Sequence, residues 1–67
     1  MRNRLKILRA ESNLSQDELA KAIKVSRQTI NAIENGKFNP SVKLALRMSE
    51  LFNCNINEIF QLEENEK

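Results

Sequence analysis

The sequence predicts an all-α fold of five short helices, and two observations support this prediction. Three residues are well placed to cap the start of a helix, each within a pair of apolar residues at the spacing of a hydrophobic staple. These cap residues are Ser15, Ser26 and Asn55. The second observation is that apolar residues recur every three to four positions near the caps, which is the period of an amphipathic helix.

The first two helices are expected in the N-terminal third of the chain. One extends from Leu5 to near Ser12–Asn13, because Leu5 and Leu8 share one helical face. A second helix over residues 16–23 is predicted by the capping-box pair Ser15–Glu18, in which each side chain accepts a hydrogen bond from the backbone amide of the other residue.

The next two helices lie on either side of the only glycine. Ser26 caps a helix over residues 27–34, which ends before Gly36. Pro40 suits a position at or just before a helix start, since its fixed φ is already helical. Asn53 is expected to end this fourth helix. Its apolar face contains Ala45, Met48 and Phe52.

The C-terminal segment is open to two interpretations. Asn55 and Glu58 repeat the cap-and-carboxylate arrangement and predict a short helix over residues 56–60. The residues Phe60–Glu63 alternate apolar and polar, which is typical of a strand, and Met1–Arg4 is placed to pair with it in a small antiparallel sheet. A fraying helix explains the same residues equally well.

The composition argues against catalysis and metal binding. The 67 residues include no His, Tyr or Trp, and the one cysteine, Cys54, has neither an imidazole to activate it nor a partner for a disulfide. The scattered carboxylates lack the spacing of a zinc or calcium site. We therefore expect a protein that is not an enzyme and holds no metal or cofactor, and no feature indicates a small-molecule ligand.

Length and hydropathy set further expectations. The longest apolar run, Leu44–Leu46, is far too short for a signal-peptide core or a membrane span, so we expect a cytoplasmic protein without a membrane partner. Residues 1–67 are expected to form one small domain whose core is marginal, so that a partner chain would help to stabilise it.

The net charge of +2 is unevenly distributed. Residues 1–48 carry ten Lys or Arg and four Asp or Glu, a net +6, whereas residues 49–67 carry one Lys and five Glu, a net −4. The basic part suits a polyanion, with the acidic tail, residues 61–67, turned away from it. A solvated surface explains the charge pattern equally well.

Residues 15–35 have the pattern of a helix-turn-helix reading unit. Two predicted helices are separated by about three residues, and in such a unit the second helix enters the DNA major groove. A small residue, Ala20, stands where the two helices would cross closely. The positions expected to be buried are all apolar: Leu19, Ala20, Ile23, Val25, Ile30 and Ile33.

The exposed face of the second helix in this unit carries side chains that suit base edges. Arg27 matches guanine, and Gln28 or Asn31 matches adenine, because their donors and acceptors complement these bases in the major groove. Ala32 is placed to touch a thymine methyl group. A solvated polar helix is the alternative.

The stretch LSQDELAKAIKVSRQTINAIENGKFNPSVKLALRMSELFNCNINEIF resembles the lambda-repressor-like helix-turn-helix family, which includes phage Cro proteins and xenobiotic-response-element regulators. The resemblance covers residues 5–60, and VSRQTINAIENGKFNPS is similar to compact bacterial repressors of the cytolysin-regulator type. It implies a five-helix DNA-binding domain that acts on operator DNA as a homodimer. In several members the terminal strands pair in a small sheet.

The resemblance also implies roles for individual residues. Base reading is assigned to Ser26, Arg27, Gln28 and Asn31, with Ala32 added from its place on the exposed face. Phosphate contacts are expected from Gln16, Thr29, Asn35, Lys37, Ser41 and Lys43. Arg9 and Glu34 match a pair that we interpret as a structural ion pair, and a weak surface pair is the alternative.

Three positions depart from the family pattern. Lys24 and Asn53 stand where glycine is frequent. A left-handed backbone costs lysine on the order of 1 kcal/mol, and asparagine tolerates it better. Cys54 stands at a usually aliphatic position, and we expect it to pack as a small hydrophobe rather than to act as a redox sensor.

Together these features predict a sequence-specific transcriptional regulator that binds double-stranded DNA. Repression is the expected mode, with a homodimer on an inverted-repeat operator. The apolar residues Leu46, Phe60 and Leu62 are candidates for the dimer contact if they are exposed. An antitoxin or a protein-interaction module with the same fold is the alternative.

Overall fold

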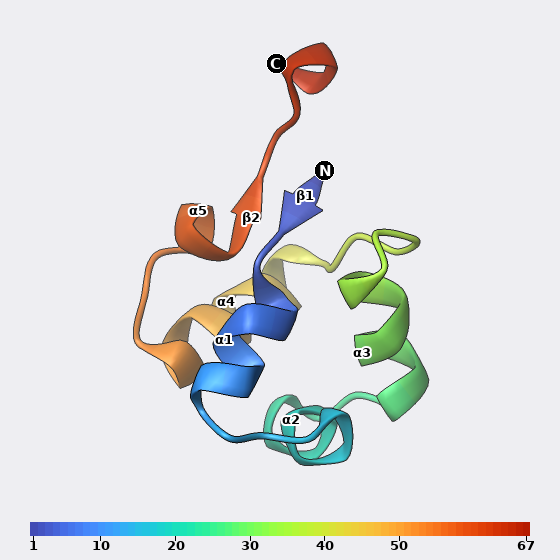
Figure 1. Cartoon of the computed structure of the whole chain (residues 1–67), viewed down its shortest axis with the longest axis vertical. Helices are drawn as coiled ribbons and strands as arrows, with labels where there is room; N and C mark the ends of the chain where they lie inside the picture. Colours follow the sequence, from blue (N-terminus) through green and yellow to red (C-terminus); the bar gives the residue numbers. More distant parts are fainter.

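The computed structural model describes all 67 residues and places five α-helices around one apolar core (Figure 1). The helices are α1 (Leu5–Glu11), α2 (Gln16–Ile23), α3 (Arg27–Glu34), α4 (Val42–Phe52) and α5 (Ile56–Ile59). The strands are β1 (Arg2–Asn3) and β2 (Phe60–Gln61), and a short 3₁₀ helix covers Glu64–Glu66. The prediction of a five-helix fold is confirmed.

Helices α2, α3 and α5 begin directly after the predicted caps Ser15, Ser26 and Asn55, whereas α4 begins after Ser41, a cap that was not predicted. The Glu18 amide donates to Ser15 Oγ at 3.0 Å, and the Ser15 amide donates to a Glu18 carboxylate oxygen at 2.8 Å. Ser26 and Ser41 cap α3 and α4 with their hydroxyl oxygens, each accepting from a backbone amide at 3.1 Å.

The hydrogen bond from the Ser15 amide is the main reason why the pKa of the Glu18 carboxyl lies below its ordinary value. This cap is therefore complete above the ordinary pKa of a glutamate and weakens as the pH falls through the lowered one.

Two helices end at a left-handed residue that is not glycine. Lys24 follows α2 with φ 62°, and Asn53 follows α4 with φ 52°. This conformation brings Cβ close to the backbone in any residue with a side chain, and glycine avoids that cost. The strain expected at Lys24 from the sequence therefore has a geometric basis.

Replacing Lys24 with glycine is expected to stabilise the protein by up to about 1 kcal/mol. The relief of left-handed strain favours the variant, and the greater chain entropy of glycine in the unfolded state offsets part of the gain. Asn53→Gly is the matched control and should gain less, because asparagine tolerates this conformation. Urea unfolding measures both changes, and a Lys24→Gly variant no more stable than Asn53→Gly would contradict strain at this turn.

The two ends of the chain meet in a two-stranded antiparallel sheet. Asn3 lies opposite Phe60 in the register of β1 and β2. The strand interpretation of the C-terminal segment is therefore correct, and the fraying helix is wrong. Helix α5 ends at Ile59, one residue earlier than predicted, because Phe60 has the extended backbone of a strand, with φ −121° and ψ 132°.

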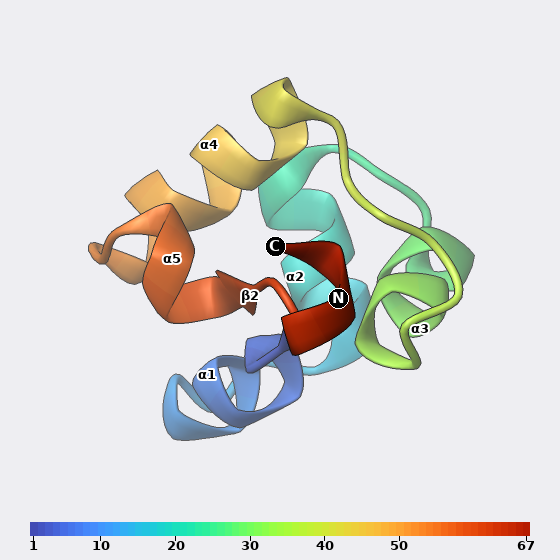
Figure 2. The ribbon, with the colours of Figure 1, turned by 90° about the horizontal axis from the view of Figure 1, so that it is seen from above.

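The core collects apolar residues from every helix. Seen from above, α3 and α5 lie on opposite sides of the molecule, with α2 between them (Figure 2). Val25 is only half-buried, whereas the other helix-turn-helix positions predicted to be inside are buried. The eleven buried residues are Leu5, Leu19, Ala20, Ile23, Ile30, Ile33, Leu44, Ala45, Met48, Ile59 and Phe60.

The described chain lacks two kinds of feature. None of its helices combines the length and apolar character needed to cross a membrane. No three side chains of the His, Cys, Asp and Glu types gather as a metal ion would require.

Candidate nucleic-acid interface

Helix α3 turns its hydrogen-bonding side chains toward solvent. Arg27, Gln28 and Asn31 are exposed, while Ile30 and Ile33 lie in the core. The three polar residues and Gln16 line a shallow hollow between α3 and the first turn of α2. The structure thus brings one expected phosphate ligand, Gln16, together with three expected base readers.

Three other expected DNA ligands at α3 are less available for contact with DNA than the sequence suggests: Ser26, Thr29 and Ala32. The hydroxyl of Ser26 lies 2.9 Å from that of Thr29 and also accepts the Thr29 amide in the N-cap. Thr29 and Ala32 are half-buried. Ser26 therefore has a structural role as the cap of α3, beside any contact with DNA.

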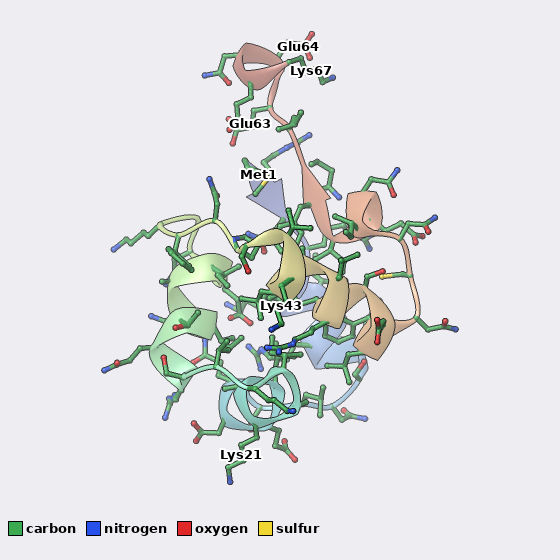
Figure 3. All side chains as sticks on the ribbon, turned by 180° about the vertical axis from the view of Figure 1, so that it is seen from behind. Met1, Lys21, Lys43, Glu63, Glu64 and Lys67 are labelled. Atoms are coloured by element: carbon green, nitrogen blue, oxygen red, sulfur yellow. The ribbon has the colours of Figure 1, made fainter.

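The remaining expected phosphate ligands lie after α3 in the chain. Asn35 and Lys37 follow the end of α3, and Ser41 and Lys43 stand at the start of α4; all four residues are exposed. Lys43 projects from α4 in the view from behind (Figure 3). None of the four lines the hollow beside Gln16.

An ion pair joins α1 to the end of α3. Arg9 Nε donates to Glu34 Oε2 at 2.7 Å, and Arg9 Nη2 donates to Glu34 Oε1 at 3.4 Å. The Arg9 and Glu34 side chains are only 16% and 4% exposed. Arg9 Nη1 also donates to the carbonyl of Leu14 at 2.8 Å, so the guanidinium ties α1 to both the loop before α2 and the end of α3.

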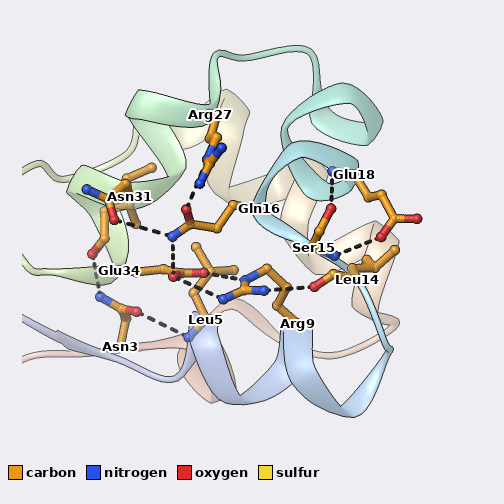
Figure 4. Close-up of polar contacts among 11 residues, drawn as sticks. Asn3, Leu5, Arg9, Leu14, Ser15, Gln16, Glu18, Arg27, Asn31 and Glu34 are labelled. Atoms are coloured by element: carbon orange, nitrogen blue, oxygen red, sulfur yellow. Dashed lines mark hydrogen bonds and ion pairs between the residues drawn. The ribbon is translucent and has the colours of Figure 1, made fainter.

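Gln16 extends this ion pair to the exposed face of α3 (Figure 4). Its Nε2 donates to Glu34 Oε1 at 3.0 Å and to Asn31 Oδ1 at 3.3 Å. Its Oε1 accepts a long hydrogen bond of 3.5 Å from Arg27 Nε. Arg27 Nη1 also lies 3.9 Å from a carboxylate oxygen of Asp17. One glutamine therefore connects a buried carboxylate to two candidate base readers.

Two side chains that support this unit were not identified from the sequence. Asn3 Nδ2 donates to the carbonyl of Ile33 at 2.9 Å, and Asn3 Oδ1 accepts from the Leu5 amide at 3.1 Å. Arg47 Nη1 donates to the carbonyl of Ile23 at 3.2 Å, at the end of α2. An asparagine commonly bonds to the backbone two residues further on in an Asx turn, whereas nothing in the sequence pairs Arg47 with Ile23.

The three dimer candidates differ in their exposure to solvent. Phe60 is only 7% exposed, so it does not meet the condition of exposure under which it was a candidate for the dimer contact. It is buried because β2 turns its side chain into the core. Leu46 and Leu62 remain 49% and 53% exposed. All three candidates, Phe60 included, line the same apolar hollow, together with Met1 and Ile56.

Cys54 is half-buried and packs against the core. Burial raises the pKa of its thiol, and the charge of Glu58 raises it further. A raised pKa favours the protonated thiol, which is less reactive than the thiolate. This environment agrees with a packing role for Cys54.

Comparison with known proteins identifies the family. The helix-turn-helix family model matches residues 5–59. An uncharacterised HTH-type transcriptional regulator of Methanocaldococcus jannaschii is 52% identical over 66 residues, which cover 98% of this chain and 100% of that relative. A second uncharacterised HTH-type transcriptional regulator, from Archaeoglobus fulgidus, is 48% identical over 66 residues, 98% of this chain and 93% of the relative.

A solved structure shows the same architecture. The restriction-modification controller protein C.AhdI from Aeromonas hydrophila matches with a TM-score of 0.77 and 30% sequence identity, over 85% of this chain and 86% of that chain. The matching family consists of DNA-binding regulators rather than enzymes, which confirms the prediction that this protein is not an enzyme. The chain belongs to the helix-turn-helix family of the Cro/C1 type.

Proposed function

We propose that this protein is a sequence-specific regulator of transcription that represses by occupying promoter DNA as a homodimer in the cytoplasm. The observation that carries the proposal is the division of α3 into two faces. Its isoleucines hold it in the core, and Arg27, Gln28 and Asn31 face solvent. Guanidinium and carboxamide groups are the side-chain groups that best match base edges in the major groove.

In this proposal the residues around α3 bind the DNA backbone. Asn35, Lys37, Ser41 and Lys43 contact phosphates, and Thr29 and Ala32 lie at the edge of the base-reading surface. The acidic tail, residues 61–67, lies away from the DNA in this proposal, so that its negative charge does not repel the phosphates. In Figure 3 the labelled Glu63 and Glu64 lie at one end of the molecule, and Lys21 of α2 lies at the other.

A second copy of the chain completes the proposed reader. One α3 spans only a few base pairs, and a two-fold axis places two such helices in major grooves roughly 34 Å apart, about one helical turn. The apolar hollow that contains Leu46 and Leu62 supports such an interface, because exposed leucines beside a concave apolar surface gain by being covered. This hollow involves α4 and α5, and α5 lies across the molecule from α3 (Figure 2).

The test is a selection of bound duplexes from a random pool at near-physiological salt, with non-specific competitor DNA present. We expect enrichment of one inverted repeat whose half-sites lie about one helical turn apart. Enrichment of single half-sites would contradict the homodimer. If the folded protein enriches no sequence, the DNA-reading proposal fails and a protein-interaction module becomes the better explanation.

A further inference from the structure

We propose that Asn35 is a site of spontaneous deamidation, and that the hydrogen bonds which close the end of α3 control its rate. Asn35 is directly followed by Gly36, the only glycine, and both residues are exposed where the chain leaves α3 (Figure 1). The reaction places a carboxylate among the residues expected to bind DNA phosphates. That consequence rests on the proposed function, whereas the modification itself does not.

The chemistry needs only the chain and water. The Gly36 amide nitrogen loses its proton to solvent and attacks the side-chain carbonyl carbon of Asn35, which closes a cyclic imide. The side-chain nitrogen takes up a proton and leaves as ammonia. Water then opens the ring at either carbonyl and produces aspartate or isoaspartate. Both products carry a carboxylate in place of the carboxamide.

The residue after an asparagine decides how readily the ring closes. A side chain on that residue crowds the attacking nitrogen, and glycine has none. Around Gly36 the approach is open, since a Cβ added there would meet no heavy atom within 4 Å beyond its chain neighbours. Asn39 is exposed in the same loop, but it precedes Pro40, whose nitrogen has no hydrogen to lose. The reaction is therefore favoured at Asn35 and blocked at Asn39.

The fold restrains the reaction because it occupies the Gly36 amide. The Gly36 N–H donates to the carbonyl of Ile33 at 3.0 Å. The Lys37 N–H donates to the carbonyl of Ala32 at 2.9 Å, and Gly36 has a φ of 74°, so the end of α3 is a Schellman motif. Asn3 Nδ2 holds the same Ile33 carbonyl at 2.9 Å. The nitrogen can attack only when this end of α3 opens.

The first experiment follows the free protein by peptide mass spectrometry in warm, mildly alkaline buffer. Asn35 is expected to be the first asparagine to exchange its NH₂ group for OH, with release of ammonia. Asn39 is the internal control and should remain unchanged. Earlier conversion of any other asparagine would overturn the proposal without any reference to DNA.

Unfolding tests whether the end of α3 controls the rate. In guanidinium chloride Asn35 should convert on the order of tenfold faster than in the folded protein, because the Gly36 amide no longer bonds to Ile33. Gly36→Ala should slow the reaction in the unfolded chain, where strain at a positive φ has no effect. Equal rates in the folded and unfolded wild type would overturn control by the fold.

A pair of variants separates local opening from global unfolding. Asn3→Ala removes one of the two donors to the Ile33 carbonyl and should speed conversion of Asn35 in the folded protein by roughly threefold to tenfold. Ser15→Ala is the matched control, because it removes the hydrogen bond of a different helix end, the start of α2. An Asn3→Ala rate no higher than the Ser15→Ala rate would overturn opening at α3.

The effect on DNA is measured with Asn35→Asp, which carries the product's charge. A carboxylate at the C-terminal end of a helix meets the negative end of the helix dipole, and here it would also repel phosphates. We expect affinity to fall on the order of tenfold for the selected operator and for a scrambled duplex alike, because phosphate contacts carry no sequence information. Added salt should reduce this loss by screening the charge.

The control for charge alone is Asn65→Asp in the acidic tail, which should leave both affinities unchanged. An Asn35→Asp variant that binds both duplexes as tightly as the wild type would overturn the effect on DNA. If the wild-type protein binds neither duplex, the proposed function fails, and the mass spectra still decide whether Asn35 is the deamidation site.

Discussion

Replacing Arg27 and Gln28 together with alanine is expected to abolish the preference for the operator and to leave the fold intact. A good paired contact with a base edge contributes about 1–3 kcal/mol of discrimination, so loss of two lowers operator affinity on the order of a hundredfold. Affinity for a scrambled duplex comes from phosphate contacts and should change far less. Anisotropy titrations with the two duplexes measure the ratio.

The fold should survive because neither side chain supports the core. The Arg27 side chain is 66% exposed, and its contacts with Gln16 and Asp17 are long, at 3.5 and 3.9 Å. The matched control is Arg4→Ala with Gln61→Ala, which removes the same residue types from positions outside α2 and α3. A control that loses operator preference, or a reading-face variant that keeps it, would contradict the assignment of α3 as the reader.

Replacing Glu34 with alanine is expected to destabilise the protein by about 3–5 kcal/mol, because it leaves the largely buried Arg9 guanidinium without its carboxylate. The same change also removes the partner of Gln16 Nε2. Small domains have a free energy of unfolding of about 5–15 kcal/mol, so this variant should be close to unfolding at room temperature. Urea unfolding followed by circular dichroism provides the measurement.

Two further variants show whether the loss comes from an uncompensated charge. Glu50→Ala removes an exposed glutamate from α4 and should change stability by less than about 0.5 kcal/mol. Arg9→Ala combined with Glu34→Ala should cost less than the sum of the single changes, since no charge is left alone. A Glu34→Ala loss below about 1 kcal/mol would identify the contact as an ordinary surface pair.

Helix starts and helix faces were predictable because their causes are local. Ser15 and Glu18 bond to each other across three residues, and this interaction depends on nothing elsewhere in the chain. The inward direction of α3 likewise follows from the spacing of Ile30 and Ile33. The same local pattern placed Arg27, Gln28 and Asn31 on the exposed face, where the structure has them.

The hydrogen bonds between side chains of different helices could not be predicted in the same way. No pattern in the sequence indicates that Gln16 contacts Glu34 and Asn31, residues that lie 18 and 15 positions further along the chain. The direction of its amide depends on a carboxylate that a third helix holds in place. Periodicity along one helix carries no information about such a contact.

Phe60, near the C-terminus, is a second case in which the local pattern does not determine a long-range contact. Its place in an alternating segment was consistent with either a fraying helix or a strand, and Phe60 was a candidate for the dimer contact only if it was exposed. Pairing of β2 with β1 decided for the strand and turned Phe60 inward, because the sheet depends on where the N-terminal residues lie in space.

The sequence by itself determined the number of helices, the caps at Ser15, Ser26 and Asn55, and the buried face and chemical character of α3, because these depend on residues within a few positions of one another. The tertiary structure alone decided which polar groups meet across helices. It buried the carboxylate of Glu34, directed the Gln16 amide and left Leu46 and Leu62 beside an uncovered apolar hollow. The hydrogen bonds depend on the packing of α1, α2 and α3 against one core, since only packing brings distant donors and acceptors within hydrogen-bonding distance. The hollow depends on how α4, α5 and β2 meet.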